Sequence, residues 1–452
     1  MQVSDGLPTP RKYWALAATL LAMAMTVLEA TITNIALPSI ARDLGVLPAQ
    51  AVWIVNAYQL AIVVALLPCS SLGEIFGYRR VFAIGLSMFT LASLGCALSG
   101  TFDVLIAFRI VQGLGAAAVM SVTPALLRFI YSQQQFGRAI GFNALVVGVS
   151  SAAGPMIGSL ILSVADWPWL FSVNVPIGLA ILAYGLRKLP KTELAKHRFD
   201  WLSASLSGLF FGLLIFGIDH LLSNLLTAML ALAGAALAGY ALVRRELPRA
   251  TPLLPLDLLR IRVFAFSIGA SVCTFAAQSI SFITLPFYFQ QAMGRSTLET
   301  GMLMVPWPLA VAITAPLAGR ATEIISPSIL CSIGTACLGL SLVVMVLLPA
   351  SAPNSMLLAC MVGCGVGFGM FQTPNNRVML TAAPRARSGS AGGLQASARQ
   401  FGMAFGAALV ALAFTAVPAY GPTTALILGV IFTSVASVIS AARRGSKLRQ
   451  PI

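Results

Sequence analysis

The sequence predicts an all-α polytopic membrane protein. Of its 452 residues, 58% are hydrophobic and only 9% are charged, and the mean hydropathy is +0.91. A soluble globular chain carries about 25% charged residues, so a buried soluble core does not account for this composition. A second observation is a succession of apolar runs of about 20 residues, the length that spans a bilayer as a helix. A third is that basic residues gather between these runs, as they do in membrane proteins.

Fourteen runs are long enough to span a bilayer. In order, their approximate bounds are 13–37, 51–72, 81–99, 103–127, 138–163, 171–187, 200–220, 223–242, 263–288, 299–318, 327–348, 356–373, 390–413 and 422–441. The division between the seventh and eighth rests only on Asp219, His220 and Asn224. Basic residues followed by an apolar run also occur in secretory signals, and here Arg11 and Lys12 precede the first run. That run is longer than the apolar region of such a signal, which has about 7–15 residues. We therefore interpret it as a retained spanning helix.

The distribution of basic residues predicts the orientation. With fourteen helices, both ends of the chain lie on one side of the membrane. If that side is the cytoplasm, only Arg42 and Arg295 of the 28 lysines and arginines fall in segments on the far side. Away from the ends of the spans, only Arg109 and Arg399 fall within them. Because basic residues favour cytoplasmic segments, we expect a multi-pass protein of the cell inner membrane with both termini in the cytoplasm.

Two basic linkers divide the chain. One covers residues 187–198, and the other covers residues 244–262. They predict an N-terminal six-helix bundle in residues 1–198, two inserted helices with a basic linker in 199–262, and a C-terminal six-helix bundle in 263–452. Two six-helix halves are typical of a transporter that rocks around a central site.

Several classes of function are disfavoured. The net charge of +15 raises nucleic acid as a partner, but the basic residues form no stripe with interleaved aromatics. The seven cysteines lack C-x-x-C spacing, the two histidines are isolated, and no Walker A loop occurs. We expect no cofactor, no metal and no enzyme activity, since no nucleophile–base pair supports a membrane-embedded enzyme. The expected partners are small-molecule substrates, protons and the lipid bilayer, and we expect a monomer.

Glu29, in the first run, is the strongest candidate functional residue. A carboxylate inside a bilayer costs about 2.5–3.5 kcal/mol or more, so it is functional by default; the alternative is a protonated or paired structural residue. Arg109, in the fourth run, needs a partner or a water-filled cavity unless it snorkels to the surface. Counted from the outer ends of their spans, the depths of the two residues differ by only about 3 Å at ~1.5 Å per residue. They could therefore share one cavity.

Two further segments have sequences suited to special backbone geometry. Residues 70–80, SSLGEIFGYRR, join the second and third runs, and Gly77 permits a tight turn beside Glu74, Arg79 and Arg80. Alone, this segment could be an ordinary basic loop.

In the fifth run, Gly154 and Gly158 permit close helix packing, and Pro155 between them kinks the helix. A generic membrane kink is the alternative interpretation.

These segments resemble motifs of the major facilitator superfamily. Residues 70–80 resemble its signature loop, G-x-L-a-D-R-x-G-R-[RK], with Ser70, Glu74 and Ile75 in place of the usual Gly, Asp and Arg. Residues 109–113, RIVQG, resemble its R-x-x-Q-G motif, whose Arg is tied to proton coupling. Residues 150–159 resemble the antiporter motif g-x-x-x-G-P-x-x-G-G, with serines at both outer positions.

Two more segments narrow the resemblance. Residues 28–38, LEATITNIALP, resemble L-D-x-T-I-V-N-V-A-L-P, which opens the fourteen-helix drug:proton antiporter-2 family. Residues 167–178, WPWLFSVNVPIG, resemble that family's W-R-W-I-F-x-I-N-V-P-I-G. Together with the helix count, the resemblance covers the whole chain, and Glu29 stands where the family has Asp. It implies the major facilitator fold, with two six-helix bundles plus two inserted helices.

The resemblance also implies a function, namely proton-coupled antiport that exports lipophilic compounds, with cations preferred, across the cytoplasmic membrane. Glu29, Asn34, Arg109 and Gln112 would serve proton coupling and substrate binding, with either a proton or a cationic substrate on Glu29. The alternative is a transporter for another solute, such as a metabolite or an organic anion, which Arg109 and Arg399 keep open.

In the same family the signature loop serves as a gate. The gating loop here would comprise Glu74, Gly77, Arg79 and Arg80. Glu74 would close the inside by approaching the amides at 388–390.

The orientation can be tested by cysteine labelling. In a chain with its native cysteines replaced, we expect Glu193→Cys to stay unlabelled by an impermeant maleimide added outside intact cells. Arg295→Cys should label, because it lies in a loop on the other side. Labelling of position 193 from outside would contradict the helix count or the orientation.

Overall fold

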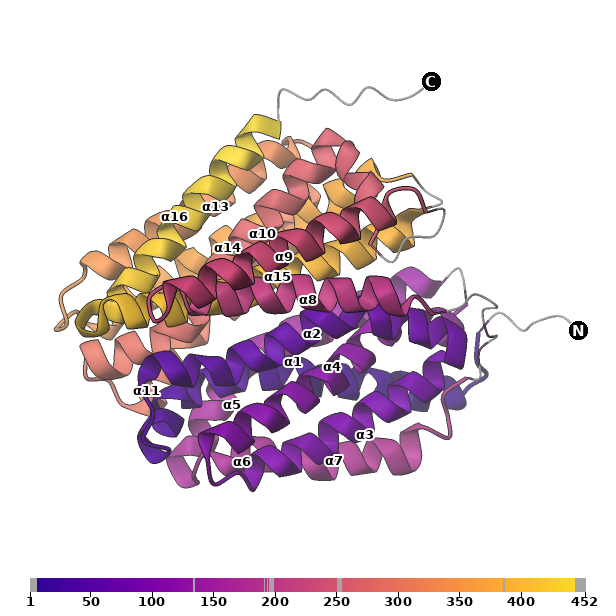
Figure 1. Ribbon diagram of the computed structural model, residues 1–452, viewed down its shortest axis with the longest axis horizontal. Coiled ribbons are helices and arrows are strands. Elements are labelled where there is room, and N and C mark those ends of the chain that lie inside the picture. Colours follow the sequence, from indigo (N-terminus) through magenta and orange to yellow (C-terminus); the bar gives the residue numbers. More distant parts are fainter. Residues whose placement is uncertain are drawn as a thin grey trace, which may run out of the picture.

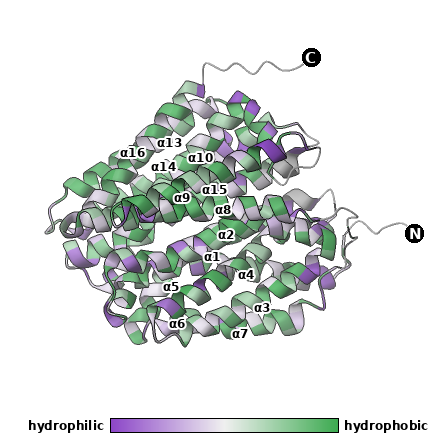
Figure 2. Ribbon diagram, viewed as in Figure 1, coloured by the Kyte–Doolittle hydropathy of each residue, from purple (hydrophilic) through white to green (hydrophobic). Residues whose placement is uncertain are grey.

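A computed structural model describes residues 6–132, 135–190, 192, 194, 199–249, 254–384 and 387–443. Fourteen helical segments of this described part are long and apolar enough to cross a membrane, which confirms the number predicted from the sequence. Figure 2 shows hydrophobic residues along the lengths of the helices and hydrophilic residues gathered toward the two ends. The architecture is therefore all-helical and multi-pass, as predicted.

The first six spans form an N-terminal bundle. Its elements are α1 (Arg11–Asp43), α2 (Pro48–Phe76), α3 (Tyr78–Ala97), α4 (Phe102–Ile130), α5 (Phe136–Val164), α6 (Pro168–Ser172), α7 (Asn174–Ala180) and η2 (Ile181–Gly185). The sixth span keeps helical dihedral angles at Val173, between α6 and α7, and its last five residues form the π-helical η2. Three of the five basic residues of the first linker, Lys191, Lys196 and Arg198, lie outside the described residues, as does Glu193.

An inserted helix pair follows. It consists of α8 (Trp201–Asp219) and α9 (Leu225–Glu246), and the short η3 (Leu256–Arg260) leads on to the next bundle. The predicted division between the two helices is confirmed, since the turn covers 220–224. The Asn224 side chain accepts a hydrogen bond from the backbone N–H of Thr227 and so caps α9.

The last six spans form a C-terminal bundle. Its elements are α10 (Arg262–Phe287), η4 (Tyr288–Ala292), α11 (Thr297–Met304), α12 (Pro306–Ala321), α13 (Pro327–Leu347), α14 (Asn354–Ala382), α15 (Ser388–Ala416), η6 (Pro418–Tyr420) and α16 (Gly421–Ala442). The tenth span is divided at Val305, because Pro306 has no N–H to donate to the preceding turn.

The spans alternate in direction, so α1 begins and α16 ends at the same end of the molecule. In Figure 1, α1 begins at the right and α16 ends at the top. We call this the linker end, because it also carries the described linker residues 186–190, 199–200, 247–249 and 254–261. The opposite end, which we call the turn end, carries the turns at 44–47, 220–224 and 293–296. Figure 1 shows the N-terminal bundle below and the C-terminal bundle above, with axes that diverge toward the linker end.

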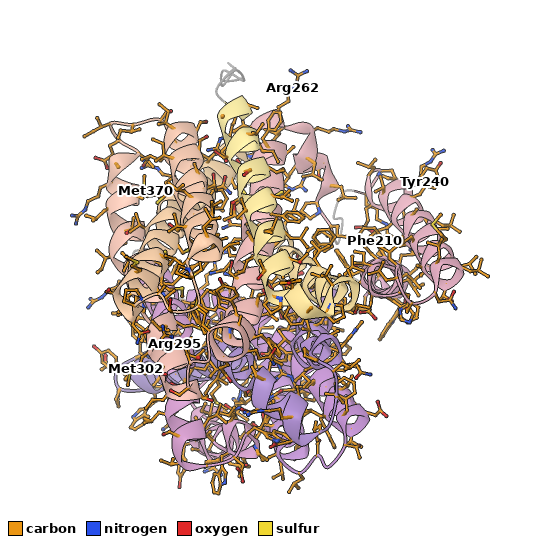
Figure 3. The ribbon with its side chains drawn as sticks, turned by 90° about the vertical axis from the view of Figure 1, so that its left-hand side faces the viewer. Phe210, Tyr240, Arg262, Arg295, Met302 and Met370 are labelled. Carbon is orange, nitrogen blue, oxygen red and sulfur yellow. The ribbon has the colours of Figure 1, made fainter. Side chains whose placement is uncertain are left out.

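The inserted pair lies at the side of the two bundles. Figure 3 shows α8 and α9, marked by Phe210 and Tyr240, beside the body of the molecule. Helix α8 packs against both α2 and α15, one helix from each bundle. Trp53 of α2 donates a hydrogen bond to Asp219 at 2.9 Å, and the rings of Phe211 and Phe401 lie 5.3 Å apart. The pair therefore covers the line along which the two bundles meet.

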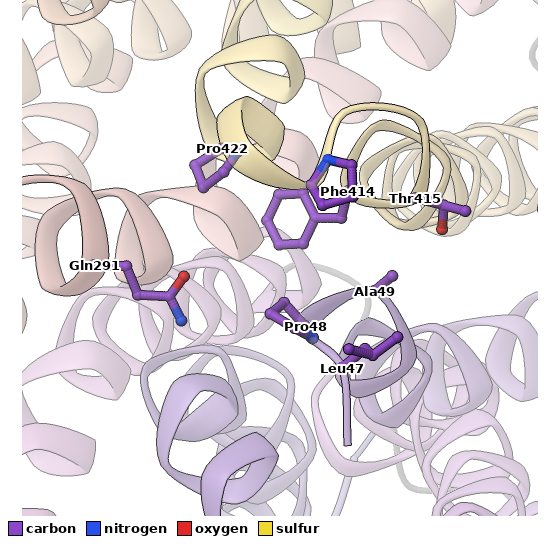
Figure 4. Close-up of a pocket in the computed structure, with 8 residues that line it drawn as sticks. Leu47, Pro48, Ala49, Gln291, Phe414, Thr415 and Pro422 are labelled. Atoms are coloured by element: carbon purple, nitrogen blue, oxygen red, sulfur yellow. The ribbon is translucent and has the colours of Figure 1, made fainter. Parts of the chain in front are cut away.

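The two bundles are joined by apolar contacts in the half of the molecule near the turn end. One buried cluster contains Ile40 and Val52 of the N-terminal bundle together with Ile283 and Val410 of the C-terminal bundle. Figure 4 shows a small pocket at the turn end that residues of both bundles line. These residues are Leu47, Pro48, Ala49, Gln291, Phe414, Thr415, Pro418 and Pro422.

The central helix α5 shows the same asymmetry. Near the turn end it packs so closely on α11 that a Cβ atom at Gly301 would lie 2.0 Å from the Ser159 hydroxyl. Nearer the linker end, a Cβ atom at Gly141 or Gly148 would meet nothing within 4 Å. The bundles are therefore closed against each other at the turn end and separated along α5 toward the linker end.

The closed end should respond to a larger side chain at its tightest contact. We expect Gly301→Leu to push α11 away from α5, because overpacking a close contact displaces the backbone. Spin labels at Ala49→Cys and Thr415→Cys should then report a longer distance by double electron–electron resonance. Gly148→Leu is the matched control, since that position faces open space; it should leave this distance unchanged. An unaltered distance in Gly301→Leu would contradict the assignment of the contact.

Candidate functional site

Glu29 lies within α1 and is buried, with 1% of its surface exposed. Both carboxylate oxygens accept hydrogen bonds. Oε1 accepts from Arg109 at 2.5 Å and from Thr33 at 3.1 Å, and Oε2 accepts from Asn174 at 2.6 Å. The predicted proximity of Glu29 and Arg109 is thus a direct ion pair inside the N-terminal bundle.

Arg109 of α4 is fully buried and connects α4 to α1 and α2. Its Nη1 donates to Glu29 and to Gln112 at 2.7 Å, and its Nε donates to the backbone carbonyl of Ile54 in α2 at 2.8 Å. The guanidinium carbon lies 4.4 Å from the centre of the Tyr58 ring, a cation–π contact. Nη2 has no hydrogen-bond partner among the described residues. The arginine is therefore held by charge, hydrogen bonds and an aromatic face, and it does not snorkel to the surface.

The other residues of the R-x-x-Q-G segment explain how this contact is made. Gln112 donates to the Ser93 hydroxyl of α3 at 2.9 Å, which fixes its amide so that the oxygen faces Arg109. A Cβ atom at Gly113 would lie 2.5 Å from the Tyr58 carbonyl oxygen. Glycine therefore lets α4 approach α2 closely enough for Arg109 to reach the Ile54 carbonyl.

Asn174 completes the site and was not among the residues predicted for it. It is the first residue of α7, and its side chain donates to Glu29 from the sixth span. The only sequence signal was the polar residue within 167–178. That segment contributed to the family resemblance but not to the predicted site.

Asn34, which was predicted for the site, is not joined to this network. It is buried, and its Oδ1 has no hydrogen-bond partner within the described part of the chain. It lies five residues beyond Glu29 in α1, closer to the turn end. Its predicted role in coupling or binding remains a prediction.

The predicted gating loop lies at the linker end between α2 and α3. Gly77 has φ +95°, a conformation that L-residues other than glycine rarely adopt, so the sharp turn requires glycine there. Glu74 and Arg80 are exposed, and Arg79 is half-buried. The backbone of α15 begins at Ser388, but the side chains at 388–390 lie outside the described residues, so closure by Glu74 remains a prediction.

The predicted antiporter motif forms the contact between α5 and α1. A Cβ atom at Gly154 would lie 2.0 Å from the Thr31 hydroxyl, and one at Gly158 would lie 2.9 Å from the Ile32 side chain. The backbone carbonyl of Pro155 faces α11, 3.0 Å from where a Cβ of Gly301 would be. The motif therefore lies between α1 and the C-terminal bundle, within one helical turn of Glu29 along α1.

A second buried polar network stabilises the C-terminal bundle near the linker end. Arg443, at the end of α16, donates to Ser267 of α10 at 2.8 Å and to Asn375 of α14 at 2.9 Å. It also donates to Ser328 of α13 at 3.1 Å. These bonds tie four helices together. Unlike the Glu29 network, this one offers no carboxylate among its described hydrogen-bond partners.

The Glu29 network has a definite chemical capacity. A buried carboxylate beside an arginine can be neutralised either by that arginine or by a proton, and each alternative favours a different set of hydrogen bonds. The side chains around the pair are Thr33, Tyr58, Ser93, Gln112 and Asn174, which come from five spans of the bundle. A change in the protonation of Glu29 would therefore alter contacts among these five spans.

Two bundles of six spans with a buried acid–arginine pair define a membrane transporter. A profile described as Major Facilitator Superfamily matches residues 19–407, and the chain belongs to that family. Its members are transporters and not enzymes. An uncharacterized transporter of Escherichia coli (strain K12), YebQ, is 45% identical over 452 residues, covering 99% of this chain and 98% of the relative.

More distant relatives have described functions. The riboflavin transporter RibZ of Clostridioides difficile (strain 630) is 32% identical over 85% of this chain and 84% of its own length. The tetracenomycin C resistance and export protein of Streptomyces glaucescens is 32% identical over 88% of this chain and 75% of its own length. A bacterial homolog of the human lysosomal transporter Spinster, crystallised in an inward-facing, unoccupied conformation, has the same fold. Its TM-score is 0.71 at 14% identity, covering 97% of this chain and 98% of that one.

The pairing of Glu29 and Arg109 should be visible in stability. We expect Glu29→Leu to lower the free energy of unfolding by about 3–5 kcal/mol, because it leaves a buried guanidinium without its counter-charge. Glu29→Leu combined with Arg109→Leu should recover most of that loss, as measured by thermal unfolding of the purified protein. Arg42→Gln, at an exposed site, serves as the control and should stay within about 0.5 kcal/mol of wild type. Additive losses in the double variant would show that the two residues are not coupled.

Proposed function

We propose that this chain is a proton-coupled antiporter that exports lipophilic compounds across the cytoplasmic membrane. The observation that carries the proposal is the buried Glu29–Arg109 ion pair, in which Nη1 of Arg109 lies 2.5 Å from Oε1 of Glu29. Family membership supports transport, and the tetracenomycin C export protein among the relatives supports export of toxic compounds.

The orientation inferred from the basic residues places the linker end in the cytoplasm. The separation of the bundles along α5 toward that end would then let a cytoplasmic compound enter between them. The closed turn end would face the outside. On this interpretation, the structure represents the state that loads substrate from the cytoplasm.

Proton coupling follows from competition at Glu29. When a proton binds the carboxylate, the ion pair is lost, and Arg109 keeps its bonds to Gln112 and to the Ile54 carbonyl. The tie between α1 and α4 is thereby weakened, and the bundle can adopt a second packing. When the proton leaves, Arg109 binds the carboxylate again. The competitor of the proton is thus Arg109 itself, which refines the exchange of proton and substrate that the sequence suggested.

The preferred charge of the substrate is a separate question. The preference for cations was inferred from Glu29 as an available acid, yet both of its oxygens accept bonds from the protein's own donors. The second candidate, transport of a metabolite or an organic anion, is favoured by the 32% identity to a riboflavin transporter. Both candidates share the same proton site and differ in what binds between the bundles.

Transport by Glu29 variants tests the coupling. We expect Glu29→Gln to abolish transport driven by a pH gradient in proteoliposomes, because the amide can neither bind and release a proton nor form an ion pair with Arg109. Glu29→Asp should retain part of the activity, since it keeps the carboxylate with a shorter reach. The assay should compare cationic, neutral and anionic compounds, with proton flux measured in parallel. Unimpaired transport against a gradient by correctly folded Glu29→Gln would overturn the proposed role, and Asp219 would be the next acid to examine.

A further inference from the structure

A second arginine within the spans, Arg399, has no side-chain partner among the described residues. Arg399 is the twelfth residue of the 29-residue helix α15 and is half-buried. Within the described residues, it makes no hydrogen bond, ion pair or ring contact. Arg109 and Arg443, in comparison, are each held by several bonds. A charge at such a depth requires a partner or a water-filled cavity. Since the described residues supply no partner, a bound molecule or water must contact the Arg399 guanidinium.

The neighbours of α15 show where Arg399 lies. Cβ atoms at Gly402 and Gly406 would lie 2.6 Å and 2.5 Å from carbonyl oxygens of α10. On another side of the helix, a Cβ at Gly393 would lie 3.6 Å from Leu67 of α2. With 3.6 residues per turn, the side chain at 399 leaves the helix between the directions of α10 and α2. That direction is the space between the two bundles.

Gln59 belongs to α2, the helix that meets α15 at Gly393, and lies at nearly the same depth as Arg399. It is buried, with 4% of its surface exposed, and its Oε1 has no hydrogen-bond partner among the described residues. The contact between Leu67 of α2 and Gly393 of α15 gives a common reference point. From it, at ~1.5 Å per residue, position 59 lies about 12 Å along α2 toward the turn end, and position 399 lies about 9 Å along α15 in the same direction. Their depths therefore differ by about 3 Å.

The charge of this region favours an anion. Among the described helices, Glu29 is the acid in the middle of a span, and it already forms an ion pair with Arg109. The other acids of these helices lie in first or last turns, namely Asp43, Glu74, Asp103, Asp219, Glu246 and Glu299. The positive charge of Arg399 is therefore not balanced at its own depth by the described part of the chain.

We propose that Arg399 binds the anionic group of the transported compound, a carboxylate or sulfonate attached to an apolar body. The planar guanidinium presents two parallel N–H groups that match such a group. Gln59 would accept a hydrogen bond from an O–H or N–H of the same compound. This inference rests on the proposed transport function and specifies the substrate class at a site distinct from Glu29.

The test uses three probes that share one apolar body: pyrenebutyrate, pyrenebutanol and pyrenebutyltrimethylammonium. Binding to the purified full chain in lipid nanodiscs is followed by energy transfer from tryptophan to pyrene, with empty nanodiscs as background. We expect the wild type to bind pyrenebutyrate more tightly than pyrenebutanol. Arg399→Gln should weaken the binding of pyrenebutyrate about tenfold or more, the scale of one charged hydrogen-bonded contact. It should leave the binding of pyrenebutanol nearly unchanged.

Further variants separate charge from structure. Arg399→Lys should retain part of the affinity, because it keeps the charge without the planar geometry. Gln59→Leu should weaken the binding of pyrenebutyrate less than Arg399→Gln does. Arg377→Gln, an exposed arginine near the linker end of α14, is the matched control and should change nothing.

Three results would overturn the inference: no saturable binding of pyrenebutyrate, equal affinity for pyrenebutyrate and pyrenebutanol, or an equal loss of all three probes in Arg399→Gln. The last result would assign a structural role to Arg399. None of them would affect the proton-coupled transport tested with Glu29→Gln. Conversely, pyrenebutyrate binding that depends on Arg399 would stand even if Glu29 proved dispensable.

Discussion

The high free-energy cost of a charge inside a bilayer organises the N-terminal bundle. Glu29 is tolerated because Arg109, Asn174 and Thr33 satisfy its oxygens, and each of these donors depends on a particular feature of the backbone. Arg109 reaches it because Gly113 allows α4 to approach α2. Asn174 reaches it from the start of α7 in the sixth span. The packing of five spans is therefore linked to the ionisation of one carboxylate.

Glycines determine where this bundle can transmit a change. Gly154 and Gly158 bring α5 against α1, and Gly301 brings α11 against the same stretch of α5. A shift of α1 near Glu29 is thus passed to the other bundle through a short chain of close contacts, without any long side chain that could absorb it. The segment that resembles an antiporter motif provides this mechanical connection, whatever compound is carried.

Much of this organisation could be predicted from the sequence, because membrane burial imposes strong patterns. Span length and hydropathy predicted fourteen helices, and Asp219, His220 and Asn224 marked the turn between the seventh and the eighth. The depths of Glu29 and Arg109 follow from a constant helical rise, so their proximity was predictable too. Asn174 was missed because hydropathy does not show which face of the sixth span meets α1. The lack of a described hydrogen-bond partner for the Asn34 oxygen, and the contact between the bundles at the turn end, depend on which faces of helices far apart in the sequence meet. The periodicity of a single helix does not specify this.

The inserted pair α8 and α9 has a consequence for how the chain is built. A hairpin of two spans leaves the membrane on the side from which it entered, so the second bundle starts on the same side as it would without the insertion. Insertion of a single span would have turned the second bundle upside down and destroyed its match to the first. Additional helices can therefore enter such a chain in pairs at the link between its halves, where they change the outer circumference of the protein and preserve the parity of everything that follows.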